Sequence, residues 1–312
     1  MKIVFFGTPT FAAEILEHLI QNKINVVAVI TKPDQPQGRS LKPVPSPVKQ
    51  YLLSKNSNIP IFQPTKASSE LEEVITSFSP DFYVVVGYGE ILRQNLLKIP
   101  KKAPINIHTS LLPTYRGAAP IQRAMMAGED VMGITVMKMN SKMDAGEILL
   151  QNLTNIGLEL VFDEVEKKLI ELSKESILKV LMNFEFYEKN AKEQDLSKIS
   201  HAPKIEIEDC HISYEGKAQH VQRKIMAFSA KPGAFLTAKI GNITKRIKIL
   251  EAVHSSKNFK KGFFTFEDGE MILGCSDGGL KILKLQPEGK NSMSYKDFFN
   301  GHKTAFPIEI VE

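Results

Sequence analysis

The sequence has no tryptophan, only two cysteines and no long hydrophobic run. Cys210 and Cys275 lie in neither a zinc-ligand nor a redox spacing, so we expect reduced thiols in a cytosolic protein. No segment reaches the roughly 18 uncharged apolar residues of a membrane span. The first residues also lack the apolar stretch and cleavage site of a secretory signal. We therefore expect a cytoplasmic protein with no membrane contact.

A dinucleotide-binding fingerprint and a metal-ligand cluster are also missing. The turn after the first apolar run is Gly7-Thr8-Pro9-Thr10, which differs from the G-x-G-x-x-G pattern that holds a pyrophosphate. An α/β sheet in this chain is therefore no evidence for a nicotinamide cofactor. Because no spaced group of histidines, cysteines or acids suggests a metal site, we expect chemistry without a metal.

Length and charge predict two globular domains with a basic second part. The 312 residues exceed one typical core, and 43% hydrophobic with 24% charged residues is an ordinary globular balance. The net charge is +5, and from Lys204 onward 17 Lys and Arg stand against 13 Asp and Glu. This excess is compatible with nucleic-acid binding, because neutralised phosphates release counterions. Surplus lysine on a solvated face explains it equally well.

The first part of the chain alternates apolar runs with helical patterns, which is typical of a parallel α/β sheet. Helical spacing predicts helices over residues 11–20 and 161–186. The predicted strands are residues 3–6, 26–30, 84–86, 105–108, 134–139 and 147–151. We predict a Rossmann-like parallel-sheet domain over residues 1–187, followed by a polar surface linker over residues 188–204.

Beyond the linker the pattern changes to short strands separated by turns. The predicted strands are residues 235–240, 247–253, 262–266, 271–275 and 280–285. Asp268-Gly269 and Asp277-Gly278 are hairpin-type turns between them. Because five short strands in so short a segment favour a small barrel of the oligonucleotide-binding type, we assign residues 205–312 to a C-terminal β-barrel domain.

The most informative segment is Ile-Asn-Ile-His at residues 105–108. Side chains alternate along a strand, so Asn106 and His108 share one face. The strand ends there, and open parallel sheets bind ligands outside the carboxyl ends of their strands. Asp144 lies farther on, in a turn between two apolar runs. An amide for the oxyanion, an imidazole for the amine proton and a carboxylate to orient the imidazole suit acyl transfer to an amine.

Each of these three residues also has a purely structural explanation. A single histidine is more often a hydrogen-bonded structural residue than a catalyst. Asn106 can satisfy backbone groups, and Asp144 can cap its own turn. The shared strand face, the strand end and the following loop together favour the catalytic interpretation.

The chain resembles the folate-dependent formyltransferase family. The resemblance rests on INIHTSLLPTYRGAAPIQ at residues 105–122 and MDAGEIL at residues 143–149. The branch of the family that acts on methionyl-tRNA is matched by FFGTP at 5–9, KPDQPQGR at 32–39, PSPVK at 45–49, VVVGYG at 84–89 and KLQPEGK at 284–290. The resemblance covers essentially the whole chain. It implies a monomer that transfers a formyl group from 10-formyltetrahydrofolate to methionine on initiator tRNA, in translation initiation.

The resemblance also implies the roles of particular residues. Asn106, His108 and Asp144 fall on the family's catalytic positions. The folate ring is expected near residues 86–92 and 139–144. The folate-binding residues implied in this way are Val86, Gly87, Tyr88, Gly89, Ile91, Leu92, Ser110, Leu111, Leu112, Pro113 and Met139.

A basic, proline-rich loop is the first place where we expect tRNA to bind. Residues 32–49 carry four basic side chains against one acid, together with five prolines that restrict the backbone. Composition alone favours a solvated connecting loop, whereas the resemblance implies the family's acceptor-stem recognition loop, with Arg39 at its key basic position. The implied nucleic-acid contacts are Arg39, Lys42 and Lys49 in this loop and Arg223 and Lys248 in the second domain.

The chain departs from the family pattern at Gly87, Thr109 and Ala145, and none of these changes removes a catalytic side chain. Residues 228–232 read FSAKP where the family usually has an Asn-Pro-Trp-Pro run.

Two other functions remain open. The first is formyl transfer to a small amine, such as a nucleotide sugar or glycinamide ribonucleotide, and the basic loop and second domain argue against it. The second is nucleic-acid binding without catalysis, against which the intact amide, imidazole and carboxylate argue.

Overall fold

The chain folds into two compact units, which interleave along the sequence. The computed structural model describes residues 1–37, 42–65, 69–157, 159–255 and 259–311. The first unit comprises Met1–Pro120, Met132–Thr154 and Glu166–Pro203, and the second comprises Ile121–Val131, Asn155–Val165 and Lys204–Glu312. Within the described ranges, no helix has the length and apolar character needed to cross a membrane.

The first unit is built on one seven-stranded sheet with the order β10-β9-β7-β6-β1-β2-β5. Its strands are β1 (Lys2–Gly7), β2 (Asn25–Ile30), β5 (Ile61–Phe62), β6 (Phe82–Val86), β7 (Ala103–His108), β9 (Val131–Lys138) and β10 (Ile148–Asn155). The pairs from β5 to β7 are parallel, which confirms the predicted Rossmann-like sheet. β9 runs antiparallel to β7, a direction that the sequence pattern does not predict.

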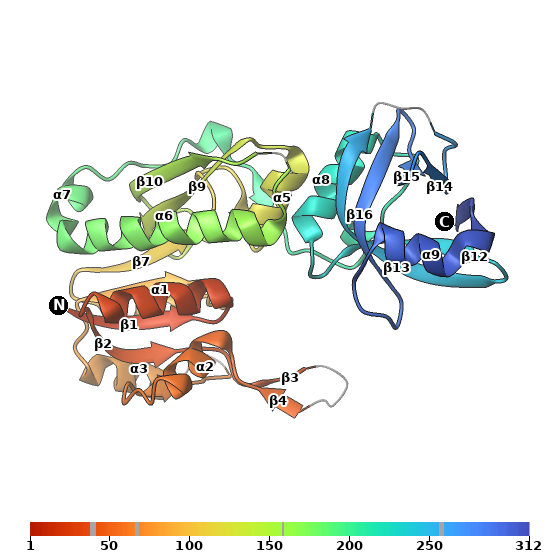
Figure 1. Cartoon of the computed structure of the whole chain (residues 1–312). Helices are drawn as coiled ribbons and strands as arrows, with labels where there is room; N and C mark the ends of the chain where they lie inside the picture. The colour runs from red at the N-terminus through yellow and green to blue at the C-terminus, as the bar shows by residue number, and fades with distance from the viewer. Residues whose placement is uncertain (38–41, 66–68, 158, 256–258, 312) are drawn as a thin grey trace. The chain divides into compact units, whose positions relative to one another are not determined.

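Burial explains why the central strands read as continuous apolar runs. All five residues of β6 are buried, and Ile3, Val4, Phe5 and Phe6 of β1 have no exposed surface. A parallel strand that is covered on both faces has no solvent-facing side, so its apolar residues do not alternate with polar ones. Figure 1 shows α1 (Thr10–Gln21) lying along β1 and α6 (Phe162–Met182) lying along β9 and β10.

The helix predicted over residues 161–186 is interrupted. α6 ends at Met182 and a separate helix, α7 (Phe184–Lys189), follows. The break falls at Asn183, whose φ of −127° and ψ of 38° lie outside the helical region. The apolar spacing continues through the break and therefore does not reveal it.

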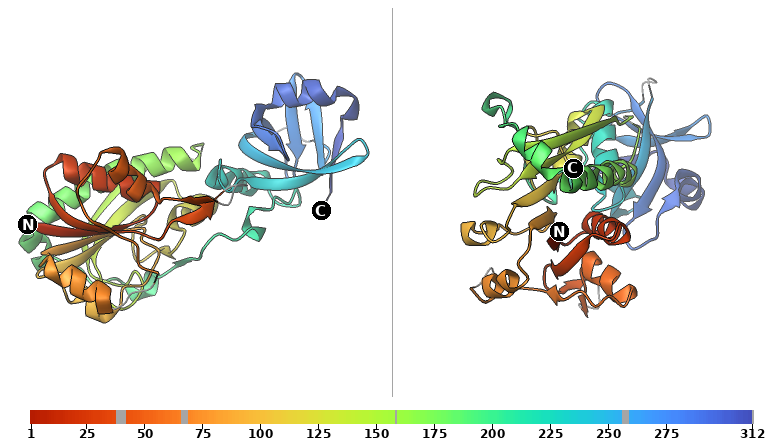
Figure 2. Two further views of the ribbon diagram at one scale, coloured as in Figure 1. Left: turned by 90° about the horizontal axis from the view of Figure 1, so that it is seen from below. Right: turned by 90° about the vertical axis from the view of Figure 1, so that its left-hand side faces the viewer.

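Several short elements of the first unit were not predicted. They are the strands β3 (Gln35–Gln37), β4 (Lys42–Val44), β5, β8 (Arg116–Gly117) and β11 (His201–Ala202), the helices α2 (Pro47–Ser54), α3 (Ser69–Ser77) and α4 (Gln94–Leu97), and a 3-10 turn at Leu196–Lys198. β3 and β4 form an antiparallel hairpin that extends away from the sheet of their unit (Figures 1 and 2). β11 lies within the segment predicted as a linker and pairs in parallel with β8.

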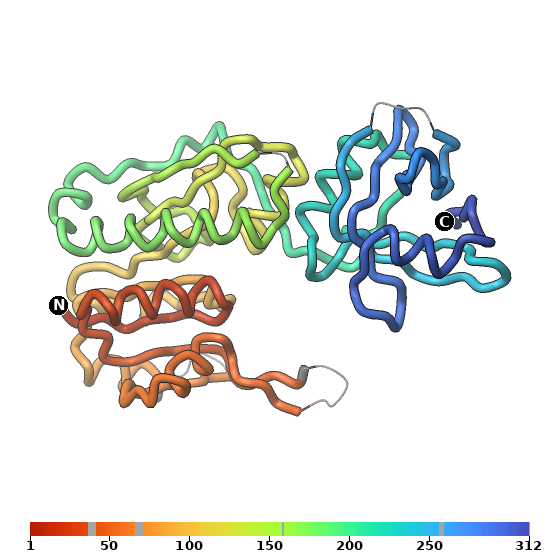
Figure 3. The backbone as a smooth tube through the Cα atoms, in the orientation of Figure 1, coloured from red at the N-terminus to blue at the C-terminus, as the bar shows by residue number. Residues whose placement is uncertain are grey.

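The second unit is a closed barrel of six strands, which confirms the predicted barrel domain. Its strands are β12 (Ala234–Ile240), β13 (Ile243–Ser255), β14 (Phe263–Glu267), β15 (Glu270–Gly274), β16 (Gly279–Pro287) and β18 (Ile308–Val311). The strand order is β13-β12-β18-β14-β15-β16, and β13 pairs again with β16 to close the ring. Figure 3 follows the backbone around this ring. The other elements of this unit are α5 (Pro120–Ala127, with Pro120 in the first unit), α8 (Ala218–Phe228), β17 (Met293–Ser294), α9 (Tyr295–His302) and 3-10 turns at Glu208–Cys210 and Lys303–Ala305.

Among the six barrel strands, β18 is the one that the sequence pattern does not predict, and the ring is continuous only through it. It pairs with β12 on one side and β14 on the other. Ile308 is fully buried and Ile310 is 5% exposed, whereas Glu309 between them is exposed. Four residues directly after a proline give too short an alternation to predict a strand.

Truncation of Ile308 should destabilise the barrel. Ile308→Ala removes buried methyl groups and leaves a cavity, so the free energy of unfolding should fall by about 2–5 kcal/mol. Glu309→Ala, on the exposed face of the same strand, should change it by less than about 0.5 kcal/mol. Urea denaturation of the whole chain measures both values. Equal effects of the two substitutions would contradict the role of β18 in closing the barrel.

Candidate functional site

Asn106 and His108 project from one face of β7, an interior strand of the first unit's sheet. They alternate with Ile105 and Ile107, which pack on the other face. Asn106 pairs in register with Val85 of β6, and β9 lies on its other side. Asn106 is 9% exposed and His108 is 6% exposed. Both polar side chains are therefore held at nearly buried positions between rigid strands.

The His108 ring is fixed by contacts at both of its nitrogens. Nε2 lies 2.9 Å from the carbonyl oxygen of Tyr115. Because a carbonyl oxygen only accepts, Nε2 carries a hydrogen and donates it. Nδ1 lies 3.7 Å from Oδ1 of Asp144, and the two side chains are 7% and 13% exposed. At this distance the two groups do not form a hydrogen bond, and catalytic contacts of this kind commonly tighten when substrate binds.

Asp144 reaches His108 from a strained turn. Its φ of +50° lies in the left-handed region, which is rare for a residue with a side chain. The backbone N–H of Gly117 donates to its Oδ2 at 2.8 Å, while Oδ1 faces His108. The loop that follows β7 thereby holds the carboxylate that faces the last residue of β7.

The same loop is anchored to the sheet by a buried hydroxyl. Thr135 of β9 has no exposed surface; its Oγ1 donates to the Ser110 carbonyl at 2.7 Å and accepts from the Leu112 N–H at 3.1 Å. Gln151 of β10 donates to the Leu112 carbonyl at 2.8 Å. These bonds fix the backbone just after His108.

The Asn106 amide is available to a ligand. Among the described residues, none hydrogen-bonds to its side chain, although the residue is only 9% exposed. A nearly buried amide without a protein partner is normally satisfied by water or by a bound molecule. Its N–H groups can therefore donate to an oxygen on which negative charge develops.

The loop after β6 contributes buried residues to the hydrophobic core of the same unit. Gly87 and Gly89 adopt φ values of +54° and +78°, and this turns the chain sharply at residues where side chains would be strained. Between them Tyr88 is buried, and burial together with nearby Glu90 raises its pKa to about 12. Its phenol therefore stays neutral and packs in this core.

Among the other residues predicted to bind folate, some are buried and some are exposed. Leu92 is 5% exposed and belongs to the same core cluster as Tyr88, against which Met139 packs. Ile91 is 74% exposed. The remaining predicted residues are Val86, Ser110 and Leu112, which are buried, and Leu111 and Pro113, which are half-buried.

The basic residues predicted in the loop of residues 32–49 differ in their surroundings. Arg39 lies outside the described residues, and Lys42 of β4 is exposed. Lys49 donates to both carboxylate oxygens of Asp34, at 2.9 and 3.0 Å, and to Oε1 of Gln63 at 2.7 Å. Hydrogen bonds from Gln63 and Lys49 lower the pKa of Asp34. Lys49 therefore neutralises a carboxylate at the base of the hairpin.

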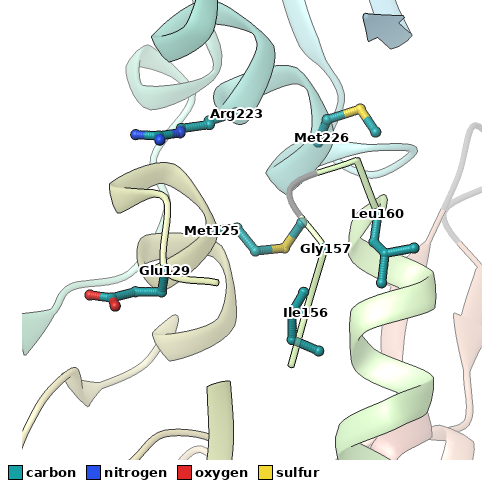
Figure 4. Close-up of a pocket in the computed structure, with 7 residues that line it drawn as sticks. All are labelled: Met125, Glu129, Ile156, Gly157, Leu160, Arg223 and Met226. Atoms are coloured by element: carbon teal, nitrogen blue, oxygen red, sulfur yellow. The ribbon is translucent and has the colours of Figure 1, made fainter. Parts of the chain in front are cut away.

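The two basic residues predicted in the second unit also make intramolecular contacts. Arg223 donates from Nη1 to the Ala127 carbonyl at 3.3 Å, at the C-terminal end of α5, where a cation is favourable. Figure 4 shows Arg223 on α8 among the residues that line a hollow with Met125 of α5. Lys248 donates to the Pro232 carbonyl at 2.6 Å. Whether these two cations bind nucleic acid stays a prediction.

Comparison with known proteins identifies relatives over nearly the whole chain. Residues 1–181 match the family described as "Formyl transferase", and residues 204–303 match "Formyl transferase, C-terminal domain". The chain is 40% identical over 304 residues to methionyl-tRNA formyltransferase of Protochlamydia amoebophila, covering 96% of this chain and 95% of the relative. The corresponding protein of Thermotoga maritima is 41% identical over 303 residues, with 96% and 95% coverage.

Solved structures of low identity share the fold. HypX from Aquifex aeolicus, in complex with tetrahydrofolic acid, superimposes with a TM-score of 0.66 at 18% identity, covering 97% of this chain. The chain spans about half, 47%, of HypX. Methionyl-tRNA formyltransferase from Clostridium thermocellum superimposes with a TM-score of 0.56 at 16% identity, covering 88% of this chain and 100% of that protein.

Removal of the Thr135 hydroxyl should loosen the loop after β7. Thr135→Val keeps the shape of the side chain but removes the hydrogen-bond partner of the Ser110 carbonyl and of the Leu112 N–H. The free energy of unfolding should therefore fall by about 1–3 kcal/mol. The Leu112 amide should also exchange its hydrogen faster, which hydrogen-exchange mass spectrometry measures. Thr154→Val on neighbouring β10 is the matched control and should leave both quantities nearly unchanged. Unaltered exchange in Thr135→Val would show that the hydroxyl does not anchor the loop.

Proposed function

Since the chain belongs to the formyl transferase family and carries both of its domains, we propose that Asn106, His108 and Asp144 catalyse its reaction. The enzyme transfers the formyl group of 10-formyltetrahydrofolate to the amino group of methionyl-tRNA. Identity of about 40% over 96% of the chain with methionyl-tRNA formyltransferases supports this substrate pair. The observation that carries the proposed site is the Asp144 carboxylate 3.7 Å from the His108 ring, on a strand face that also presents the Asn106 amide, to which none of the described residues hydrogen-bonds.

The residues that we propose to bind the folate ring include an apolar cluster in the same unit as this triad. Tyr88, Leu92 and Met139 pack in one apolar cluster of the same unit, and an apolar wall with a few convergent polar groups is typical of a small-molecule site. The Asn106 amide supplies such a polar group. These residues would bind the flat ring and exclude water from the reacting carbon.

In the reaction the amine of methionine forms a bond to the formyl carbon, and the bond from that carbon to the folate nitrogen breaks. The pKa of an α-amino group is about 7.7–8.0, so a useful fraction of the amine is neutral near pH 7–8. Asn106 donates a hydrogen bond to the formyl oxygen as negative charge develops on it. The protein therefore stabilises the charge while the substrate provides the nucleophile.

His108 and Asp144 carry out the proton transfer. The amine loses a proton after attack, and the leaving folate nitrogen gains one, so a single imidazole can accept the first and deliver the second. Because Nε2 already carries the proton that it donates to the Tyr115 carbonyl, Nδ1 is the nitrogen that accepts the amine proton, and the Asp144 carboxylate that faces Nδ1 stabilises the imidazolium. The three residues thus have separate roles in one transfer.

The macromolecular substrate is the part of the proposal that needs both units. The hairpin of β3 and β4 and the basic barrel give the chain surfaces that a formyltransferase for a small amine does not need. We propose that the initiator tRNA is the preferred acceptor. The cytoplasmic location expected from the sequence and the monomeric state implied by the resemblance stay predictions.

Loss of the Asn106 amide should slow catalysis. Removal of one oxyanion donor typically costs about 10²–10³ in rate, so Asn106→Ala should lower kcat by that factor, with little change in KM for either substrate. Formation of N-formylmethionyl-tRNA from 10-formyltetrahydrofolate measures the rate. Asn95→Ala, an exposed asparagine on α4, is the control and should keep wild-type kcat. A wild-type kcat in Asn106→Ala would remove this residue from the mechanism.

Lys42 and Lys49 should differ in their effect on tRNA binding. Lys42 is exposed, so Lys42→Ala should weaken tRNA binding and reduce the slope of log affinity against log salt by about 1, the value for one phosphate contact. Lys49 is paired with Asp34, so Lys49→Ala should leave that slope nearly unchanged. Filter binding at several salt concentrations measures both. The assignment fails if the slope falls for Lys49→Ala and not for Lys42→Ala.

A further inference from the structure

We propose that Gln194 is a positioning residue for catalysis, because its amide joins the turn that carries Asp144 to the loop that holds His108. This inference rests on the proposed function of Asp144. Gln194 lies in the segment between the two family domains, 50 residues after Asp144. It is 9% exposed, although its neighbours Glu193 and Asp195 are exposed. A buried glutamine in an otherwise polar stretch indicates a specific set of partners.

The nitrogen of the Gln194 amide binds the turn on both sides of Ala145. Nε2 donates to the Asp144 carbonyl at 2.9 Å and to the Gly146 carbonyl at 2.8 Å. The same turn is confined from the other side, because a Cβ on Gly146 would lie 1.5 Å from the Lys138 carbonyl oxygen of β9. The turn is therefore held between a strand and the amide, and this contact stabilises the left-handed backbone of Asp144.

The oxygen of the same amide binds the loop after β7. Oε1 accepts from Nε of Arg116 at 3.1 Å and from Nη2 at 2.6 Å. The guanidinium is always charged, so these bonds are stronger than neutral ones. Arg116 precedes Gly117, whose N–H binds the Asp144 carboxylate at 2.8 Å. Gln194 thereby closes a ring of contacts that runs from the Asp144 backbone through Arg116 and Gly117 to the Asp144 side chain.

The residues that follow Gln194 bind the same loop and extend this support to His108. Ser200 accepts the Tyr115 N–H on its Oγ at 2.8 Å and the Arg116 N–H on its carbonyl at 2.9 Å. The carbonyl of Tyr115 is the group that accepts from His108 Nε2. The inter-domain segment therefore holds both partners of the 3.7 Å contact between His108 and Asp144.

A change at Gln194 should reduce turnover rather than substrate affinity. Displacement of a catalytic group by about 1 Å can cost 10²-fold in rate, and Gln194 contacts the two segments that set the carboxylate position. Gln194→Met keeps the length of the side chain and removes every hydrogen bond. We expect kcat to fall about 10- to 100-fold, with KM for folate and for tRNA within about threefold of wild type. Glu193→Ala, at the exposed neighbouring position, is the matched control and should keep wild-type kcat.

The decisive experiment is a double-mutant cycle with Asp144→Asn, measured by single-turnover formyl transfer. If Gln194 acts through Asp144, then Gln194→Met should change the rate by less than about twofold in the Asp144→Asn background. A purely structural role predicts the same fold-loss in both backgrounds, and that result would overturn the proposal. If Gln194→Met does not fold, Gln194→Glu, which keeps an acceptor for Arg116, enters the same cycle.

Failure of this inference is distinguishable from failure of the proposed function. A wild-type chain that forms no N-formylmethionyl-tRNA would overturn the function itself. An active wild-type chain with an unchanged kcat in Gln194→Met would overturn the role of Gln194 alone and leave the formyl transferase assignment in place.

Discussion

The position of the Asp144 carboxylate depends on a backbone conformation that the residue would not adopt unaided. A left-handed φ of +50° costs a residue with a side chain about 1–2 kcal/mol, so surrounding contacts must supply that free energy. The Gly117 N–H binds the carboxylate, and the amide of Gln194 binds the carbonyls on either side of Ala145. The same contacts place the carboxylate beside His108. The hydrogen bonds that stabilise the strained backbone of Asp144 are therefore the same ones that position its carboxylate for the proposed reaction.

The fold supplies rigid support for this contact. β7 lies inside the sheet, with β6 on one side and β9 on the other, so hydrogen bonds to both neighbours hold its backbone in place. β9 also carries Thr135, which holds the loop after β7, and the chain returns at β11 to pair with that loop. The second unit is a separate barrel closed by β18. One unit thus carries the proposed catalytic residues, and the other contains an excess of basic residues, which is compatible with a large acidic substrate.

Local patterns in the sequence predict much of the fold and part of the site. Apolar runs predict the central strands, and strand alternation places Asn106 and His108 on one face. Local patterns do not predict the antiparallel direction of β9 or the strand β18, because both depend on pairing between segments that are distant in the chain. The role of Gln194 is not predictable for the same reason, because its partners lie about 50 and 80 residues away. A single glutamine also belongs to no recognisable sequence motif. Folate and tRNA follow from resemblance to a family, because spacing alone indicates only acyl transfer to an amine.

The central claim is that this chain formylates methionine only when tRNA carries it. The direct test supplies 10-formyltetrahydrofolate and, in parallel, methionyl-initiator tRNA, methionyl-elongator tRNA and free methionine, then quantifies N-formylmethionine after release from the tRNA. The account predicts rapid formylation of the initiator species, slower formylation of the elongator species and none of free methionine. Consumption of the folate at equal rates with and without tRNA would contradict the account, because the acceptor would then be a small amine or water.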